Sequence, residues 1–301
     1  MGSNPTGPSS RRLATGGYAA RVRLERFETI EGFLGAARDF LADREAEHNL
    51  LFGISHTLLT APGVYPKPPY LAVVSDGIEV VAAAMQTPPW NLVLSETDRP
   101  AAADLFVEDR VSDPPPGVLG PTALAERFAA GLAQRTGTPV RLRRRERIFE
   151  LDTLVMPRRV MGGMRAAGRA DRAVLVDWLT EFVDEALDGE SPTDVEAIVD
   201  RWIEGSGRTM YLWVDNGLPV SMTGVGSPTP NGVRVGPVYT PRDLRGRGYA
   251  SNLVARACQA AFGAGRRSVF LFTDLGNPTS NHIYQAIGFR PVTDVDDWAI
   301  G

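Results

Sequence analysis

Two arginines and two glycines alternate in a short turn, Arg245-Gly246-Arg247-Gly248, directly before an apolar helical pattern. The segment in front of it, 233–239, reads as a strand, so the turn joins a strand to a helix N-terminus. The first amides of a helix have no partner inside the helix, and the helix dipole adds positive charge there. Glycine lets a ligand approach the backbone closely, and arginine adds charge-assisted hydrogen bonds. The residue types and their order therefore predict a cradle for a phosphate or pyrophosphate.

The spacing excludes two other phosphate-binding patterns. The turn lacks the Gly-Lys-Ser/Thr ending of a P-loop, and it lacks the G-x-G-x-x-G spacing of a dinucleotide-binding turn. Gly-rich turns also precede helices for purely structural reasons. The turn alone therefore leaves that structural interpretation open.

A second group of polar residues follows the next predicted strand, 268–273. Asp274 ends that strand, and Asn277 followed by Pro278 is typical of a helix start. The helix then carries Tyr284. Taken alone, Tyr284 is a core tyrosine on the buried side of an amphipathic helix.

Together the two segments resemble the GNAT superfamily of N-acetyltransferases. The sequence VGPVYTPRDLRGRGYASNLV is similar to the acetyl-CoA motif R/Q-x-x-G-x-G/A of that family, here Arg245, Gly248 and Ala250. The sequence DLGNPTSNHIYQAIGF is similar to the motif that follows it, with its Asn277, its Tyr284 and its closing Gly-Phe. The two motifs occur in the family's order, with the expected elements between them.

The resemblance implies a slot between two parallel strands that splay apart around acetyl-CoA. The pantetheine arm would lie along 237–240 and contact Asn277, the pyrophosphate would lie on the amides of 245–251, and Tyr284 would be the general acid near the thioester sulfur. The implied cofactor-binding residues are Pro237, Val238, Tyr239, Thr240, Arg245, Gly246, Arg247, Gly248, Tyr249, Ala250, Ser251 and Asn277.

The family reaction is the direct attack of an amine on a thioester. A lysine-like amine has a pKa of ~10.4, so a base or a relay to water must take its proton at neutral pH. Many family members use a Glu on the fourth strand, but 233–239 contains no carboxylate. Asp274 is one candidate catalytic base, and a role in the turn is its alternative. Glu181, Asp184 and Glu185 are further candidates, which solvated surface charge explains equally well.

The elements around these residues repeat along the chain. Segments 70–74 and 79–85 read as a hairpin turned at Ser75-Asp76-Gly77, and 210–214 and 218–224 as another turned at Asp215-Asn216-Gly217. Each hairpin follows a pair of helical patterns and precedes a strand, a helix and a strand. We therefore expect tandem GNAT-like domains of the α+β (α/β) class, each a mixed central β-sheet flanked by helices.

The two predicted domains differ in their expected function. We expect a disordered tail at 1–17, a degenerate GNAT-like domain at 18–155 and a catalytic GNAT domain at 156–301. The nearest counterpart of the cradle in the first half is Gly117-Val118-Leu119-Gly120, which follows three prolines and has no arginine. Segment 157–167 reads as a connector, and Ser191-Pro192-Thr193 as the cap of a helix.

Composition limits the classes of partner. The 301 residues suit two domains of ~150 residues, and a net charge of −4 with a pI near 5.5 gives no reason to expect nucleic acid. No apolar run reaches the ~18 residues of a membrane span, and no Cys/His cluster predicts a metal. The single cysteine, Cys258, and the lack of an apolar leader in Met1–Ser10 favour a cytoplasmic protein. An oligomer is compatible with the sequence.

The sequence thus predicts an enzyme, an acyl-CoA-dependent N-acyltransferase. It would transfer an acetyl group from acetyl-CoA to a primary amine of a small molecule or a protein, without a metal. The alternative is a non-catalytic acyl-CoA-binding sensor or scaffold, which the missing strand carboxylate favours. A transferase for longer acyl chains would share the fold.

Overall fold

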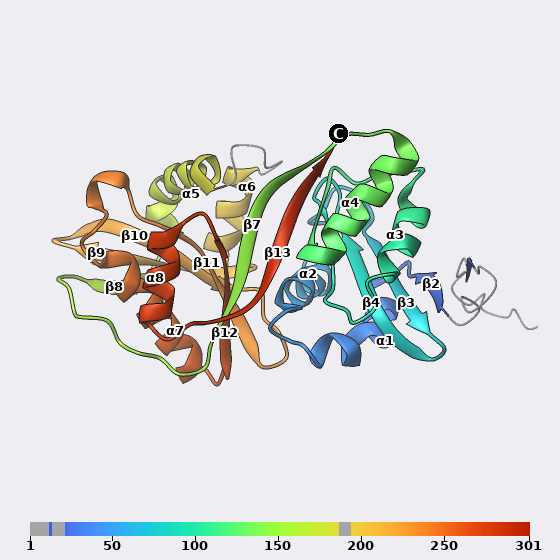
Figure 1. Cartoon of the computed structure of the whole chain (residues 1–301). Coiled ribbons are helices and arrows are strands. Elements are labelled where there is room, and N and C mark those ends of the chain that lie inside the picture. Colours follow the sequence, from blue (N-terminus) through green and yellow to red (C-terminus); the bar gives the residue numbers. More distant parts are fainter. Residues whose placement is uncertain (1–11, 14–21, 187–193) are drawn as a thin grey trace, which may run out of the picture. The chain divides into compact units, whose positions relative to one another are not determined.

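The computed structural model describes residues 12–13, 22–186 and 194–301 (Figure 1). They fall into two compact units that interleave in sequence, whereas the sequence analysis expected a single boundary at 155–156. Unit 1 holds the chain up to Arg44, then Leu58–Arg144 and Val295–Gly301. Unit 2 holds Glu45–Thr57 and Arg145–Asp294. Of the tail expected at 1–17, Arg12–Leu13 form the short strand β1, and the rest lies outside the described residues.

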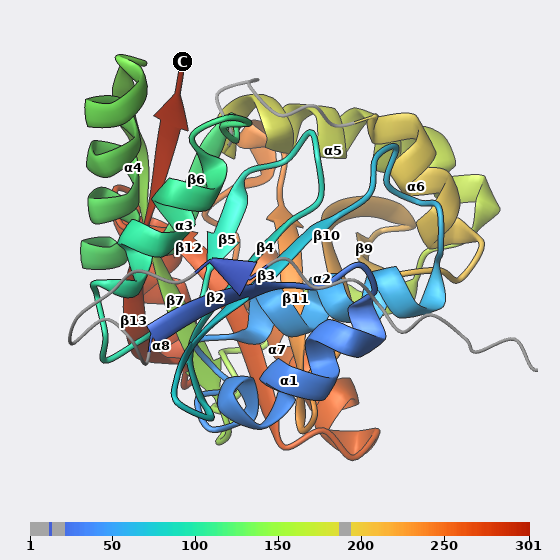
Figure 2. The same cartoon turned by 90° about the vertical axis from the view of Figure 1, so that its right-hand side faces the viewer.

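Unit 1 is a mixed sheet with helices on both faces (Figure 2). Its strands, in spatial order, are β1, β2 (Val22–Arg26), β3 (Tyr70–Asp76), β4 (Glu79–Gln86), β5 (Leu92–Leu94), β6 (Gly117–Pro121) and the C-terminal end of β13 (Arg290–Ile300). Helices α3 (Ala102–Arg110) and α4 (Thr122–Thr136) pack on one face around Phe106 and Phe128. Helix α1 (Ile30–Ala42) packs against β3 and β4 with its buried Phe33 and Leu41.

Unit 2 is a second mixed sheet of the same kind. Its strands, in spatial order, are β8 (Gly163–Ala166), β9 (Arg208–Asp215), β10 (Leu218–Gly226), β11 (Gly232–Tyr239), β12 (Ser268–Asp274) and the C-terminal part of β7 (Val140–Leu151). Its helices are α5 (Arg172–Ala186), α6 (Val195–Ile203), α7 (Tyr249–Gly263) and α8 (Pro278–Ala286). Helix α2 (Asn49–Thr60) contributes its residues up to Thr57.

The order of elements is the same in both halves of the chain. The first half runs β2-α1-α2-β3-β4-β5-α3-β6-α4-β7, and the second runs β8-α5-α6-β9-β10-β11-α7-β12-α8-β13. The predicted duplication and fold class are thereby confirmed. Both hairpins turn where the sequence predicted, and Asn216 and Gly217 have the positive φ angles of 48° and 79° that such a turn requires.

Three elements were missed or misread. Helix α3 escaped prediction because it is short and mixes its buried Ala102, Ala103, Phe106 and Val107 with charged residues. Segment Gly117–Pro121, which the sequence offered as the nearest counterpart of the cradle, is strand β6, and its glycines allow close approach of neighbouring chain segments. The connector expected at 157–167 contains strand β8, which pairs with β9.

Each unit's sheet is completed by a strand from the other half of the sequence. In unit 2, Glu146–Leu151 of β7 pair antiparallel with β12. In unit 1, Val295–Ala299 of β13 pair antiparallel with β6. The long strands β7 and β13 therefore both contribute residues to the two units, which is why the units interleave.

The two faces of the unit 2 sheet have separate cores. Helices α7 and α8 pack against β11 and β12 through Val254, Cys258 and Tyr284. Helices α5 and α6 pack against β9, β10 and β11 on the other face, through Leu175, Trp178 and other apolar residues.

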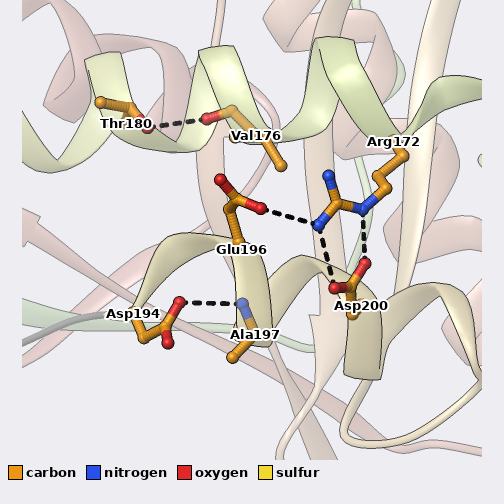
Figure 3. A network of polar contacts seen from close by, with 7 residues as sticks. All are labelled: Arg172, Val176, Thr180, Asp194, Glu196, Ala197 and Asp200. Carbon is orange, nitrogen blue, oxygen red and sulfur yellow. Dashed lines mark hydrogen bonds and ion pairs between the residues drawn. The ribbon is translucent and has the colours of Figure 1, made fainter.

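A polar network joins α5 to α6 (Figure 3). The Arg172 guanidinium donates to Asp200 at 2.6 and 2.9 Å and to Glu196 at 3.0 Å. The hydrogen bond from Arg172 lowers the pKa of the Asp200 carboxyl. Asp194 caps α6 by accepting from the Ala197 amide at 3.0 Å. The cap predicted at 191–193 lies outside the described residues.

No helix in the described segments is long and apolar enough to cross a membrane. The same segments contain no group of three or more His, Cys, Asp or Glu side chains arranged to hold a metal ion.

Candidate active site

Strands β11 and β12 pair only at their beginnings. Their parallel ladder covers Gly232–Arg234 opposite Ser268–Phe270 and then stops. Beyond it, β11 continues to Tyr239 paired with β10, and β12 continues to Asp274 paired with β7. The facing edges of 235–239 and 271–274 therefore lack each other as hydrogen-bond partners, and we call the space between them the slot. Unpaired strand edges present backbone donors and acceptors to whatever lies there.

A bulge at the slot turns the backbone of β11. The register shifts between Thr223–Val238 and Val225–Val235, which leaves Gly236 and Pro237 opposite a single residue of β10. Gly236 has a φ of 135°, which a residue with a side chain rarely adopts. Bulges of this kind end a ladder and re-aim the groups beside it.

The predicted cradle lies at the start of α7. Gly246 and Gly248 have φ angles of 76° and 80°, and Gly248 precedes the first helical residue. The Asn252 amide donates to Gly248 O at 3.1 Å, so the amides before it have no acceptor inside the helix. Unpartnered amides at a helix start are the arrangement that favours a bound anion.

Asn252 was not among the predicted site residues. Its side chain is 3% exposed, and its Nδ2 donates to Arg158 O at 3.0 Å and to Gly248 O at 3.1 Å. These bonds hold the turn to the chain in front of β8. A polar residue on an otherwise apolar helix face is the sequence signal that could have revealed it.

The two arginines of the turn bind protein groups. Arg245 donates from Nε to Thr240 O at 2.8 Å and from Nη2 to Glu185 at 2.7 Å. Arg247 donates to Asp243 O at 3.0 Å. Burial opposes ionisation of Glu185, but the hydrogen bonds from Arg242 and Arg245 outweigh it and lower the pKa of its carboxyl. The arginines thus fix the shape of the turn, and Arg245, 44% exposed, still borders solvent.

The side chain of Tyr249 does not face the cradle. Its hydroxyl donates to Asp215 at 2.7 Å, in the turn of the β9–β10 hairpin. Among the predicted cofactor-binding positions, Tyr249 can therefore offer only its backbone amide, as can the neighbouring Ala250.

Asn277 and Asp274 hold the turn before α8. Asn277 Oδ1 accepts from the Ser280 amide at 3.0 Å, which is the predicted cap, and its Nδ2 has no partner within the described segments. Asp274 is exposed, and its carboxylate accepts from the Gly276 amide at 2.7 Å. Asp274 therefore performs the turn role that the sequence analysis gave as its alternative.

Tyr284 is buried in the core between α7 and α8. Its ring packs edge-on against Phe289 with centroids 5.9 Å apart, and the structure gives its hydroxyl no hydrogen-bond partner among the described residues. Burial raises the pKa of this phenol well above its ordinary value of ~10. The group is therefore protonated over the whole physiological range and able to donate.

Glu181 lies against the end of β11. Its carboxylate accepts from the Tyr239 hydroxyl at 2.5 Å, and Tyr239 is 5% exposed. Burial first, and then the bond to Glu181, raises the pKa of Tyr239 to about 12. Ser221 holds the same strand end by donating to Tyr239 O at 2.9 Å. The sequence named Glu181 among several carboxylates, and the structure bonds it to the hydroxyl of Tyr239.

The corresponding region of unit 1 is closed. Strands β5 and β6 pair at Leu92–Val118 and Val93–Leu119, and a Cβ built on Gly120 would lie 2.9 Å from Leu94 Cβ. The strands therefore remain in contact to the end of β5, without a slot.

The counterpart of the cradle in unit 1 is the loop 95–101 before α3. It is not Gly117–Gly120, which belongs to β6. Ser95 and Thr97 are used in bonds to the backbone of β4, and Pro100 has no amide to offer. The loop also carries the carboxylate of Asp98, paired with Arg44 at 2.7 Å. The loop thus differs from the cradle in having no glycine and in carrying a carboxylate.

Known proteins were compared with the chain at the levels of sequence and structure. Residues 174–289 match the sequence model described as acetyltransferase (GNAT) family. A search of curated protein sequences finds no match to the chain.

Several solved structures share the fold over nearly the whole chain. A Drosophila protein has a TM-score of 0.63 at 12% identity, covering 92% of this chain and 98% of its own. A tandem GNAT protein from the clavulanic acid biosynthesis pathway has a TM-score of 0.57 at 13% identity, covering 93% of this chain and 98% of its own. A GCN5-related N-acetyltransferase from Sphaerobacter thermophilus has a TM-score of 0.56 at 18% identity, covering 93% of this chain and 96% of its own.

Identities this low show the fold alone, and the fold that they show spans both halves of the chain. The sequence match covers the slot, the cradle and Tyr284. Residues 174–289 therefore form an acetyltransferase (GNAT) domain.

Proposed function

We propose that the protein transfers an acetyl group from acetyl-CoA to a primary amine, with unit 2 as the catalytic unit. The observation that carries this proposal is the parting of β11 and β12 after Arg234, directly in front of a helix start with unpartnered amides. An extended arm with amide groups suits the unpaired strand edges, and a pyrophosphate suits the amides of 246–251. Bound there, acetyl-CoA supplies the acetyl group as a thioester.

Tyr284 is proposed as the general acid. The new nitrogen–carbon bond forms as the carbon–sulfur bond breaks, and the departing sulfur takes the phenol proton. A free thiol has a pKa of ~8.5, so it is mostly protonated at neutral pH. The departing sulfur therefore gains from a proton donor. The buried, protonated hydroxyl of Tyr284, with no acceptor among the described residues, supports this role.

Glu181 is proposed as the base that takes the amine proton. It hydrogen-bonds Tyr239, which ends β11 at the slot, and it can receive a proton directly or through that hydroxyl. Asp274 is the alternative, but its carboxylate is engaged by the turn amide of Gly276.

Replacing Glu181 with glutamine is expected to lower kcat about 100-fold at pH 7, because general-base catalysis contributes ~10²–10⁴-fold. The variant should recover activity as the pH approaches the amine's own pKa of ~10.4, where the free base forms without help. Glutamine can still accept from Tyr239, so the packing is retained. Steady-state rates across pH measure this.

Asp184→Asn is the matched control, since Asp184 is an exposed carboxylate on the same helix. It should leave the pH–rate profile unchanged. If Glu181→Gln and the wild type have parallel profiles at all pH values, Glu181 is not the base, and Asp274→Asn becomes the variant to compare.

The chain is expected to bind one acetyl-CoA rather than two. Unit 1 keeps β5 and β6 together and replaces the cradle by a loop with Pro100 and Asp98. Calorimetric titration of the full chain should give a stoichiometry of one, unchanged by Asp98→Ala. A second site of comparable affinity would contradict the interpretation of unit 1 as a degenerate copy.

Thiol release tests the function itself. The full-length protein, acetyl-CoA and a panel of primary amines should release free CoA in proportion to N-acetylated product. Binding of acetyl-CoA without release for any amine would support the sensor alternative. Absence of binding would refute both.

A further inference from the structure

Two arginines lie on neighbouring positions across three strands of unit 2. Arg208 of β9, Gly226 of β10 and Arg234 of β11 are direct register partners. Because side chains alternate along a strand, Arg208 shares the face of Met210, which belongs to the core under α5 and α6. Arg234 shares that face, since its neighbours Val233 and Val235 belong to the opposite core.

Gly226 lets the two guanidinium groups come together. A Cβ at Gly226 would lie 2.5 Å from Cγ of Arg208, so any side chain there would displace that arginine. Because Gly226 has no side chain, the side chain of Arg208 crosses β10, and its Nη1 donates to the backbone oxygen of Arg234 at 3.5 Å. The Arg234 guanidinium lies over the ring of Phe272 in β12, 5.7 Å from its centroid. The pair thus spans from β9 to the far wall of the slot.

Arg208 has only neutral partners. Its Nη2 donates to Ser227 Oγ at 3.0 Å, and no carboxylate among the described residues pairs with it. Burial first, and then the charge of Arg234, lowers the pKa of Arg208 to about 9. Part of the residue nevertheless remains accessible to solvent. A guanidinium carries five donors, and a mostly surrounded guanidinium with no carboxylate partner, such as that of Arg208, is costly unless an anion compensates its charge.

The location connects this pair to the reaction. Arg234 is the last residue of β11 that pairs with β12, so the cations lie where the slot opens. On the other face, Val233, Val235 and Leu271 are packed under α7 and α8. The arginines themselves lie on the face of the sheet where α5 and α6 pack against β9, β10 and β11. Helix α2 borders the same place, since a Cβ on its Gly53 would meet Ser227 Cβ at 2.7 Å.

We infer that Arg208 and Arg234 bind an anionic group of the acceptor, so that the amine substrate carries a carboxylate. This inference rests on the proposed transfer to an amine and names the class of that amine. Arginine forms planar, bidentate pairs with carboxylates and gives each hydrogen bond extra strength. Amino acids or their derivatives fit this chemistry, whereas polyamines and aminoglycosides offer only further positive charge.

Matched acceptors test the inference in the full-length protein. L-Lysine is compared with cadaverine, and L-serine with ethanolamine, pairs that differ by the carboxylate alone. The carboxylate is expected to raise kcat/KM about 10–100-fold, the worth of one or two charged hydrogen bonds. Arg208→Gln should remove this preference and leave the KM for acetyl-CoA unchanged. Arg208→Lys, which keeps the charge without the fork, should retain part of it.

The control is Arg256→Gln, an exposed arginine on α7, which should change nothing. Equal rates for both members of each pair, or an equal loss for all acceptors in a folded Arg208→Gln protein, would overturn the inference. A preference for phosphoethanolamine over the amino acids would instead assign the site to a phosphate and overturn the inference that the acceptor carries a carboxylate.

A binding measurement separates this inference from the function on which it rests. N-acetyl-lysine and N-acetylcadaverine are titrated into the wild type by calorimetry. Tighter binding of the carboxylate compound, lost in Arg208→Gln, would sustain the anion site even if no amine is acetylated. Equal or absent binding of both would count against the site, whatever the turnover.

Discussion

Replacing Gly248 with tryptophan is expected to weaken acetyl-CoA binding more than 100-fold. Gly248 has a φ of 80°, which a residue with a side chain rarely adopts, and a Cβ there would already lie 3.1 Å from Val160 Cγ1. An indole must therefore displace the turn that aims the amides of 246–251. Losing two charged hydrogen bonds of ~1.5–3 kcal/mol each accounts for a loss of this size. Calorimetry with the wild type and the variant measures it.

Gly265→Trp is the control for backbone strain. Gly265 has a φ of 87° just beyond the other end of α7, where a Cβ would meet open space. This variant carries the same kind of strain and should bind acetyl-CoA normally. If Gly248→Trp is folded and binds as the wild type does, the cradle is not the cofactor site.

Replacing Tyr284 with phenylalanine is expected to lower kcat about 100-fold with little change in the affinity for acetyl-CoA. Phenylalanine keeps the edge-on packing against Phe289 and removes only the hydroxyl. General-acid catalysis is worth ~10²–10⁴-fold, so the whole effect belongs to the chemical step. Steady-state kinetics and calorimetry on the same preparation separate kcat from binding.

Tyr211→Phe is the corresponding control, because Tyr211 is a partly buried tyrosine of β9 on the same side of the sheet as α7. Its kcat should equal that of the wild type. An unchanged kcat in Tyr284→Phe would remove the acid role, and a parallel loss of affinity would indicate a binding role instead.

Local sequence patterns predicted the parts of the site that depend on neighbouring residues. The glycines of the cradle have the positive φ angles that their spacing suggested, and Asn277 caps α8 as its position before Pro278 indicated. The hairpin turns were also readable, because they require residues that tolerate unusual backbone angles. Each of these features is decided within about five residues of chain.

Features that depend on distant residues were not predictable. Glu181 could not be chosen over Asp184 because the choice depends on Tyr239, which lies in another element. Arg208 looks like an ordinary strand residue until β10 places Gly226 beside it. Arg245 was expected to face the ligand, yet Glu185 of α5 and the Thr240 carbonyl hold it.

The missing elements have a related cause. The counterpart of the cradle in unit 1 was sought at Gly117–Gly120 because glycines were the guide. Those glycines serve close contacts of β6, where a Cβ on Gly117 would lie 2.5 Å from Trp298 O. A glycine that accommodates a neighbouring strand and a glycine that accommodates a ligand are identical in sequence.

The completion of each sheet by a strand from the other half bears on how such a protein can evolve. A duplicated gene usually frees one copy to be lost once its activity is dispensable. Here Val295–Ala299, encoded at the end of the second copy, pair with β6 of the first, and Glu146–Leu151 from the end of the first copy pair with β12 of the second. Deleting either copy would leave the survivor with an unpaired sheet edge, a site prone to aggregation. Selection can therefore change the loop before α3 in unit 1 while it retains the sheet of that unit. Recombination between such genes should exchange the two copies only together.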